Sequence, residues 1–450
     1  MERDFYLWQL QRQKQIWTGS WCAKRRLHGI PRRSVRKAAG RRKRFCPPEE
    51  PACWEGVYKA DHFGCVCPQT EHEPDSFYGK EFYLDPEFGM KQSEDCLYLN
   101  IWTPANTVDE KLPVAFWIHG GAFMHGFSHE SEFDGAAYCE RGVILVAINY
   151  RLGAFGFLAH PWLSEESGAG RSGNYAILDQ IAALKWVKEN IAAFGGDPEN
   201  ITVFGQSAGC MSVQTLVSSP LTENWISKAI FQSAGGYDTG LNRDMPLSEA
   251  ETIGQEFVEL SGAKSLEELR AIPAEKIVEL QEEFGRVNPS RMLSFVPNID
   301  NHLLTCGYND AVTEGKIKDI PYMLGSTADD IGVFPEMKEK ASTAASIRDA
   351  STGALPLEKL RKKTGLTFTT FTRALLGDDA GAFQFLRTLV HVRNPGPKLA
   401  PENRRRLCPQ QRNDGRLDQF HENRKPERRG KRRLETMHKG RPVCAGAGCE

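Results

Sequence analysis

The chain has 450 residues, 40% of them hydrophobic, and a formal net charge of −1. This length suits one large domain or two smaller ones, and 12 cysteines are too dilute for a disulfide scaffold. Lys and Arg gather at both ends of the chain, which leaves an acidic middle and argues against nucleic-acid binding there.

Several further classes of protein are excluded by missing patterns. The sequence has no apolar run long enough to span a membrane and no apolar leader at its N-terminus, so we expect no membrane segment and a cytoplasmic location. It has no pair of cysteines separated by two residues, and its His and Cys residues lack zinc-site spacing. We therefore predict that the protein needs no metal and no cofactor.

Composition divides the chain into three segments. Residues 1–43 are basic and show no clear periodicity, and we question their reading frame. Residues 44–383 have the patterning of a globular domain. Residues 384–450 are rich in Arg, Asn, Gln and Pro with few apolar clusters, which predicts a disordered tail because such a chain cannot bury enough apolar surface.

Within residues 44–383, short apolar runs alternate with helical patterns. The runs are apolar on both faces, which is typical of parallel strands covered on both sides. They lie at residues 113–118, 143–149, 201–204, 229–231 and 321–324.

Two stretches have helical periodicity. Residues 175–194 place apolar side chains three and four apart and are followed by Gly195-Gly196-Asp197-Pro198, a typical helix stop. Residues 245–285 have the same periodicity and indicate an added helical subdomain. Strands that alternate with helices predict an α/β fold with a mostly parallel central sheet and helices on both faces.

The clearest chemical signal is Gly205-Gln206-Ser207-Ala208-Gly209, which follows one of the predicted strands and precedes a helical stretch. This G-x-S-x-G pattern is that of a nucleophile elbow, a sharp strand-to-helix turn that exposes a serine with strained backbone angles. The flanking glycines let neighbouring backbone pass without a clash. We therefore predict that Ser207 is a catalytic nucleophile.

A second serine stands in a similar context. Gln232-Ser233-Ala234-Gly235 repeats four letters of the pattern after another apolar run, but Phe231 stands where the elbow needs glycine. We therefore interpret Ser233 as part of a loop at a strand end rather than as a nucleophile.

A glycine-rich segment, His119-Gly120-Gly121-Ala122-Phe123, follows the strand predicted at 113–118. Acyl transfer needs N–H groups that already point at the developing negative charge on the substrate oxygen. We predict an oxyanion hole formed by the N–H groups of Gly120, Gly121 and Ala208. His119 and His125 are expected to be structural, because the base follows the acid in the chain order typical of this elbow.

These segments resemble the type-B carboxylesterase family, which includes para-nitrobenzyl esterases and cholinesterases. The resemblance covers residues 44–383 and implies the α/β-hydrolase fold and hydrolysis of small carboxylic esters. It rests on stretches that occur in the family's order and spacing: Ser93–Ile101, His119–Phe123, Asn149–Gly153, Gly173-Asn174, Phe194–Pro198 and Phe204–Gly209.

The resemblance also implies roles for residues outside these motifs. It assigns the acid of the triad to Asp330, with Asp329 as the rival, although relatives commonly have Glu there. It implies an ion pair between Glu94 and Arg151. It matches Cys67 and Cys96 to a disulfide of secreted members, and in a cytosolic chain we expect these thiols to stay reduced.

The chain departs from the family pattern at the catalytic base. Bacterial relatives read Gly-Asp-Asp-Ala-Gly-Ala-Phe-His, whereas this chain reads Gly377–Phe383 and then Gln384. Glutamine cannot take the proton of the serine. A one-base frameshift at codon 384 would explain the change, because the shifted frame can encode His-Ser-Ser-Glu-Leu. We therefore predict an esterase that is impaired as written.

Two other functions stay open from the sequence. A non-catalytic binding protein of the same fold would explain the missing base, although such family members usually lose the serine as well. The Arg-rich tail at residues 384–450 could serve as a nucleic-acid arm, but it lacks the interleaved aromatic residues of such segments.

Overall fold

The computed structural model describes residues 16–20, 43–49, 62–76, 79, 90–130, 133–222, 224–234, 244–291, 293–327 and 367–372, hereafter the described residues. Most of the segment 1–43 and all of the tail 384–450 lie outside them, so the predicted boundaries of the three segments stay predictions.

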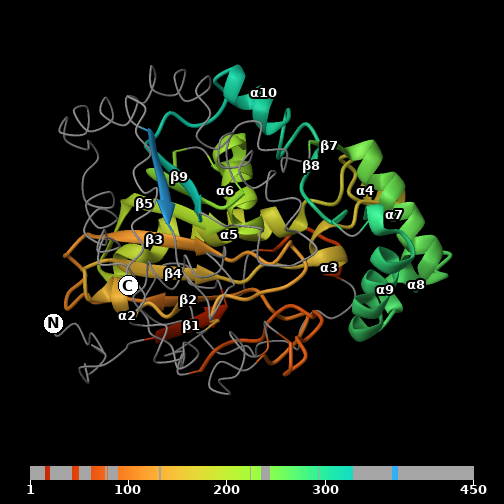
Figure 1. The fold of residues 1–450 in the computed structure, drawn as a ribbon, viewed down its shortest axis with the longest axis horizontal. Helices are drawn as coiled ribbons and strands as arrows, with labels where there is room; N and C mark the ends of the chain where they lie inside the picture. Colours follow the sequence, from red (N-terminus) through yellow and green to blue (C-terminus); the bar gives the residue numbers. More distant parts are fainter. Residues whose placement is uncertain are drawn as a thin grey trace, which may run out of the picture.

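The described residues form an eight-stranded sheet (Figure 1). β1–β2 and β2–β4 pair antiparallel, and every other neighbouring pair is parallel. In spatial order the strands are β1 (Ile16–Ser20), β2 (Tyr98–Trp102), β4 (Ile144–Ile148), β3 (Leu112–Ile118), β5 (Gly196–Gln206), β6 (Lys228–Gln232), β9 (Tyr322–Thr327) and β10 (Thr367–Thr372). The five apolar runs predicted as parallel strands are all confirmed, as β3, β4, β5, β6 and β9.

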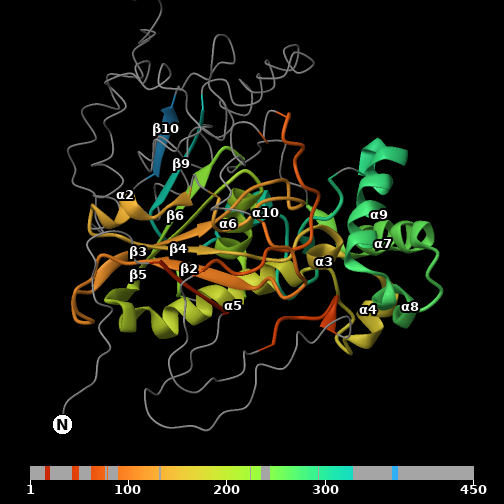
Figure 2. The same ribbon diagram turned by 90° about the horizontal axis from the view of Figure 1, so that it is seen from below.

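Alternating side chains on the central strand β3 face two separate cores. Phe116 and Ile118 belong to the larger core, which also contains residues of helices α5 (Tyr175–Asn190) and α6 (Ala208–Ser218). Trp117 belongs to a smaller core on the opposite face, next to α2 (Ala136–Cys139). Figure 2 shows α5 and α2 on opposite sides of the sheet. Both faces are therefore covered, which explains why the strands are apolar throughout.

The predicted helix over 175–194 is confirmed as α5 followed by a single 3-10 turn over Ile191–Phe194. Gly195 ends it in the left-handed conformation, with a φ of 80°. A left-handed glycine is a common way to end a helix because it lacks a Cβ that would clash. The short helices α3 (Gly153–Phe157), α4 (Pro161–Glu166) and α10 (Tyr308–Thr313) complete the α/β body.

The helical subdomain predicted over 245–285 is also confirmed. It contains α7 (Leu247–Ser261), α8 (Leu266–Ala271) and α9 (Ala274–Val287), beside a two-stranded sheet of β7 (Met245–Pro246) and β8 (Asn298–Ile299). Figures 1 and 2 both place these helices at one end of the sheet, next to α3 and α4. Phe257, Phe284 and Phe295 stack edge-on or tilted at its centre.

The expected ion pair between Glu94 and Arg151 is wrong. Glu94 pairs with Arg44, whose Nε donates to Glu94 Oε2 over 2.8 Å. Arg151 instead pairs with Asp179 of α5, with 2.7 Å between Arg151 Nε and Asp179 Oδ2. Glu94 and Arg151, the two residues from the family motifs, therefore each pair with a residue outside those motifs. The motifs alone do not reveal these pairings.

Candidate active site

The turn at Ser207 has the backbone of a strained strand-to-helix elbow. Ser207 has a φ of 54° and a ψ of −123°, and α6 begins at the next residue. A non-glycine residue in this region is uncommon and is held there by its surroundings. The Ser207 N–H donates to Gln232 O on β6 over 2.9 Å, so the turn is fixed to the neighbouring strand.

The two glycines of the motif are required by close packing. A Cβ on Gly205 would lie 2.5 Å from the Gly209 carbonyl oxygen and 2.8 Å from Ile118 O. A Cβ on Gly209 would overlap the Ile118 carbonyl oxygen. The spacing of the motif therefore follows from three backbone segments that meet at one point.

The loop that follows β3, residues 119–126, lies directly beside Ser207. β3 and β5 are parallel neighbours, with Ile118 opposite Gly205, so both turns leave the same edge of the sheet. A Cβ on Gly120 would lie 3.3 Å from Ser207 Cβ and 2.7 Å from Gln206 O. The structure thus places Gly120 close to Ser207 and Ala208, while the roles predicted for these residues stay predictions.

Unusual backbone angles shape this loop. Gly121, Ala122 and Phe123 have φ values of 98°, 57° and 61°. The Gly121 carbonyl accepts bonds from the N–H groups of Met124 and His125, each over 2.9 Å. Among the described residues, the N–H groups of Gly120 and Gly121 have no hydrogen-bond acceptor. The Ala208 N–H, at the first position of α6, lacks an acceptor within its helix. These are the three N–H groups predicted to form the oxyanion hole, and that role stays a prediction.

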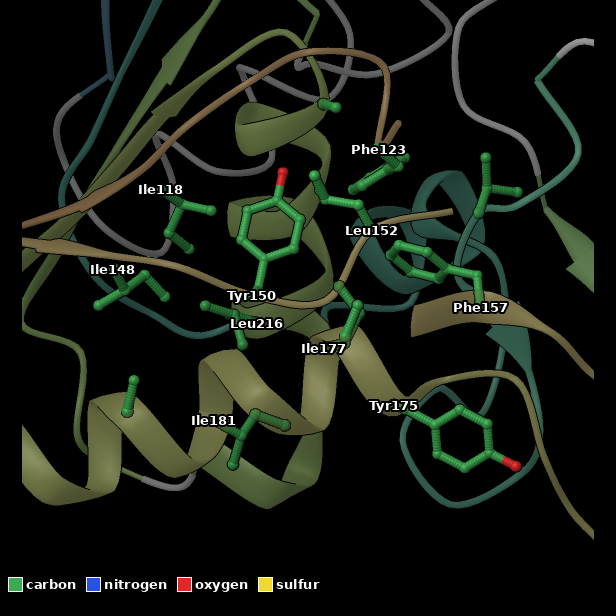
Figure 3. Close-up of a cluster of buried hydrophobic side chains, with 14 of the residues drawn as sticks. Ile118, Phe123, Ile148, Tyr150, Leu152, Phe157, Tyr175, Ile177, Ile181 and Leu216 are labelled. Carbon is green, nitrogen blue, oxygen red and sulfur yellow. The ribbon is translucent and has the colours of Figure 1, made fainter. Parts of the chain in front are cut away.

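Both ends of the loop are anchored by buried side chains. The Tyr150 hydroxyl donates to His119 O over 2.9 Å, and the Tyr150 ring stacks on the His119 ring at 4.3 Å (Figure 3 shows Tyr150). At the other end, the Gln69 side chain accepts from the Gly126 N–H over 2.7 Å and donates to Gly126 O. Sequence reasoning did not identify these anchors, although Tyr150 lies in the singled-out stretch 149–153.

The histidines of the loop have structural surroundings. Burial lowers the pKa of His119 to about 4, against an opposing hydrogen bond with the Gly120 carbonyl. Burial also lowers the pKa of His125, whose ring lies 5.5 Å from that of His72. The structural role expected for these two histidines stays a prediction.

Comparison with known proteins places this arrangement in a family. The model of the carboxylesterase family matches residues 37–376. The chain belongs to the carboxylesterase family. It is 35% identical over 345 residues to fumonisin B1 esterase of Sphingopyxis macrogoltabida, which covers 76% of this chain and 56% of that protein. It is 38% identical over 296 residues to para-nitrobenzyl esterase of Bacillus subtilis (strain 168), covering 65% of this chain and 57% of that protein.

Solved structures of carboxylesterases have the same fold. A PNB esterase superposes with a TM-score of 0.71 and 26% identity, covering 93% of this chain and 89% of that one. A carboxylesterase of Geobacillus stearothermophilus superposes with a TM-score of 0.68 and 29% identity, covering 88% of this chain and 84% of that one. The predicted α/β-hydrolase fold is therefore confirmed. The chain spans less than two thirds of the length of the two relatives above.

Other residues predicted from the carboxylesterase pattern lie outside the described residues. They include Asp330, its rival Asp329 and Gln384, and β9 ends at Thr327, three residues before Asp330. Ser233 is described, with a φ of 53° and a buried hydroxyl. Cys67 and Cys96 are both buried free thiols that share a hydrogen bond, which with burial raises the pKa of Cys96.

In the part of the chain that the structure describes, no helix is long and apolar enough to cross a membrane. Over the same residues, no group of three or more His, Cys, Asp or Glu side chains could hold a metal ion.

Proposed function

We propose that this protein is a carboxylic ester hydrolase that acts on a small-molecule ester through an acyl-enzyme on Ser207. The observation that carries the proposal is the left-handed Ser207 at the start of α6, with the Gly120 backbone packed against its Cβ. Such a backbone is costly for serine, by about 1–3 kcal/mol, and strain of this kind clusters at functional sites. Membership of the carboxylesterase family supports the same reaction.

The chemistry follows from these positions. Ser207 Oγ attacks the ester carbonyl carbon while its proton passes to a general base, and the carbonyl π electrons move to the oxygen. The N–H groups of Gly120, Gly121 and Ala208 hold that oxyanion. Collapse of this intermediate breaks the bond to the alcohol, which takes the proton from the base as it leaves. Water, deprotonated by the same base, then attacks the acyl group, and Ser207 leaves with the proton as the acid is released.

The proposal includes the absence of the general base. The family histidine would follow Phe383, where this chain has Gln384, and Asp330 would orient its imidazole. Without the histidine, the oxyanion hole and binding still give a small residual acceleration. Under the proposed frameshift at codon 384, the loss of the histidine comes from the reading frame that encodes this chain. Gln384 also favours the alternative, a binding protein that keeps the fold without turnover.

A comparison of two proteins tests the proposal. We expect this chain to hydrolyse a short p-nitrophenyl ester very slowly. A version with the shifted frame restored, so that histidine follows Phe383, should turn over about 10⁴–10⁶-fold faster. Mass spectrometry should locate a fluorophosphonate label on Ser207 of the restored protein.

Each other outcome has a definite meaning. Restored protein that neither hydrolyses the ester nor takes the label would favour the binding protein. Normal turnover by the chain as written would show that another histidine serves as base. His391 is the first to replace by alanine in that case.

A further inference from the structure

The buried side chain of Gln281 reaches from the helical subdomain into the α/β body. Gln281 lies on α9 and is 6% exposed. Its Oε1 accepts the N–H of Ala154, in the first turn of α3, over 2.5 Å. A Cβ on Gly153, whose φ is 50°, would overlap this same oxygen. The contact therefore fixes the start of α3 against α9 and leaves no room for a side chain at position 153.

The same turn of α3 holds the loop beside Ser207. The Gly153 N–H donates to the carbonyl of Phe123 over 2.7 Å. At the other end of α3, the Phe157 ring packs edge-on against the Phe123 ring, with centroids 4.9 Å apart, and Figure 3 shows the two rings together. Phe123 is therefore held in place through both its backbone and its side chain.

Phe123 needs such support because its backbone is strained. Ala122 and Phe123 are consecutive non-glycine residues in the left-handed region, where each conformation costs about 1–2 kcal/mol. The exposed Ala122 makes no side-chain anchor, so the contacts of Phe123 stabilise the turn. The turn begins at Gly121, whose carbonyl accepts the N–H groups of Met124 and His125, so its geometry bears on the direction of the Gly121 N–H.

We propose that Gln281 is a positioning residue that holds the oxyanion loop in place through α3. The path runs from Gln281 Oε1 to the Ala154 N–H, along the Gly153 backbone to Phe123 O, and so to Gly121. Gln281 touches neither Ser207 nor the substrate oxygen. Its catalytic consequence rests on the proposed function, whereas its hold on the loop does not.

The test measures the loop and the chemistry separately in the full-length, frame-restored protein. Gln281→Leu removes the acceptor at nearly constant size, and Gln281→Glu keeps an acceptor oxygen. Ile277→Val, on the same buried face of α9, is the matched control for loss of packing. Hydrogen exchange follows the amides of Met124 and His125, which bond within the loop and not to Gln281. The rate of fluorophosphonate labelling at Ser207 follows the chemistry.

We expect Gln281→Leu to speed exchange at Met124 and His125 and to slow labelling on the order of tenfold. Gln281→Glu and Ile277→Val should both stay within about twofold of the unaltered chain. Unchanged exchange in Gln281→Leu, or equal acceleration in Ile277→Val, would overturn the positioning role. Faster exchange with unchanged labelling would uphold the link between Gln281 and the loop and refute the oxyanion role of that loop.

Discussion

Two strand ends of this molecule share a sequence and a backbone angle but differ in their surroundings. Gln-Ser-Ala-Gly occurs after β5 and again after β6, and Ser207 and Ser233 have φ values of 54° and 53°. Ser207 is partly exposed at the start of a helix and beside the Gly120 loop. Ser233 is 7% exposed, and its hydroxyl has no partner among the described residues.

The residue two before each serine accounts for much of the difference. Gly205 lets the backbones of Gly209 and Ile118 approach, which brings the turn against the loop after β3. The equivalent Phe231 is buried and packs edge-on against the rings of Tyr308 and Tyr322. If the proposed function is right, the local sequence and one dihedral angle are therefore not enough for a nucleophile, because the N–H donors of a neighbouring loop must also be able to approach.

The largest expected effect comes from replacing one of the two serines at a time. In the frame-restored protein, Ser207→Ala should lower kcat by about 10⁴–10⁶-fold, because the acyl-enzyme cannot form. Ser233→Ala should change kcat only a few-fold. Steady-state hydrolysis of a p-nitrophenyl ester measures both. A larger loss in Ser233→Ala would reverse the assignment of the nucleophile.

A smaller change tests the packing around the first serine. Gly205→Ala places a Cβ 2.5 Å from the Gly209 backbone, so the turn must shift. A displacement of about 1 Å costs on the order of 10²-fold in turnover, and we expect that loss in kcat of the restored protein.

Gly142→Ala is the control for a loss of stability, because Gly142 has a φ of 73° but a Cβ there would meet nothing within 4 Å. It should lose stability without losing kcat. Equal kcat losses in the two variants would mean that lost stability, and not the approach of Gly209, explains the effect of Gly205→Ala.

The last expected effect concerns stability rather than turnover, and it involves the histidine behind the loop. The pKa of His119 is about 4 in the folded protein and about 6.5 when exposed, so only the unfolded chain takes up its proton between these values. Its contribution to stability is therefore complete above pH 6.5 and is lost as the pH falls towards 4. The loss amounts to about 3 kcal/mol in the free energy of unfolding.

His119→Phe keeps a ring against Tyr150 and removes this titration. Denaturant titrations at pH 7 and pH 4 should show a smaller pH dependence for His119→Phe than for the unaltered chain. If His119→Phe retains the full dependence, other groups cause the acid sensitivity.

The features that could be predicted from sequence are those set by local patterns. Strand β5, the turn at Ser207 and helix α6 follow from an apolar run, two glycines and a helical stretch within about twenty residues. Partners from distant segments could not be predicted. Glu94 finds Arg44, 50 residues away, and Ala154 finds Gln281, 127 residues away. No periodicity or motif encodes these contacts, because they depend on how the sheet and the helices pack in the folded chain.

Arg44 also bears on the order in which the chain folds. Its buried guanidinium bonds Glu94 and donates to the Ile272 carbonyl, 228 residues further along, while lying 5.6 Å from the Phe155 ring centroid. Contacts of such long separation close late, because loop-closure entropy opposes them until the intervening chain is ordered. During synthesis, this arginine must wait until α8 has left the ribosome. Until then its charge stays solvated by water. The helical subdomain thus completes the burial of a residue that is synthesised more than two hundred residues earlier.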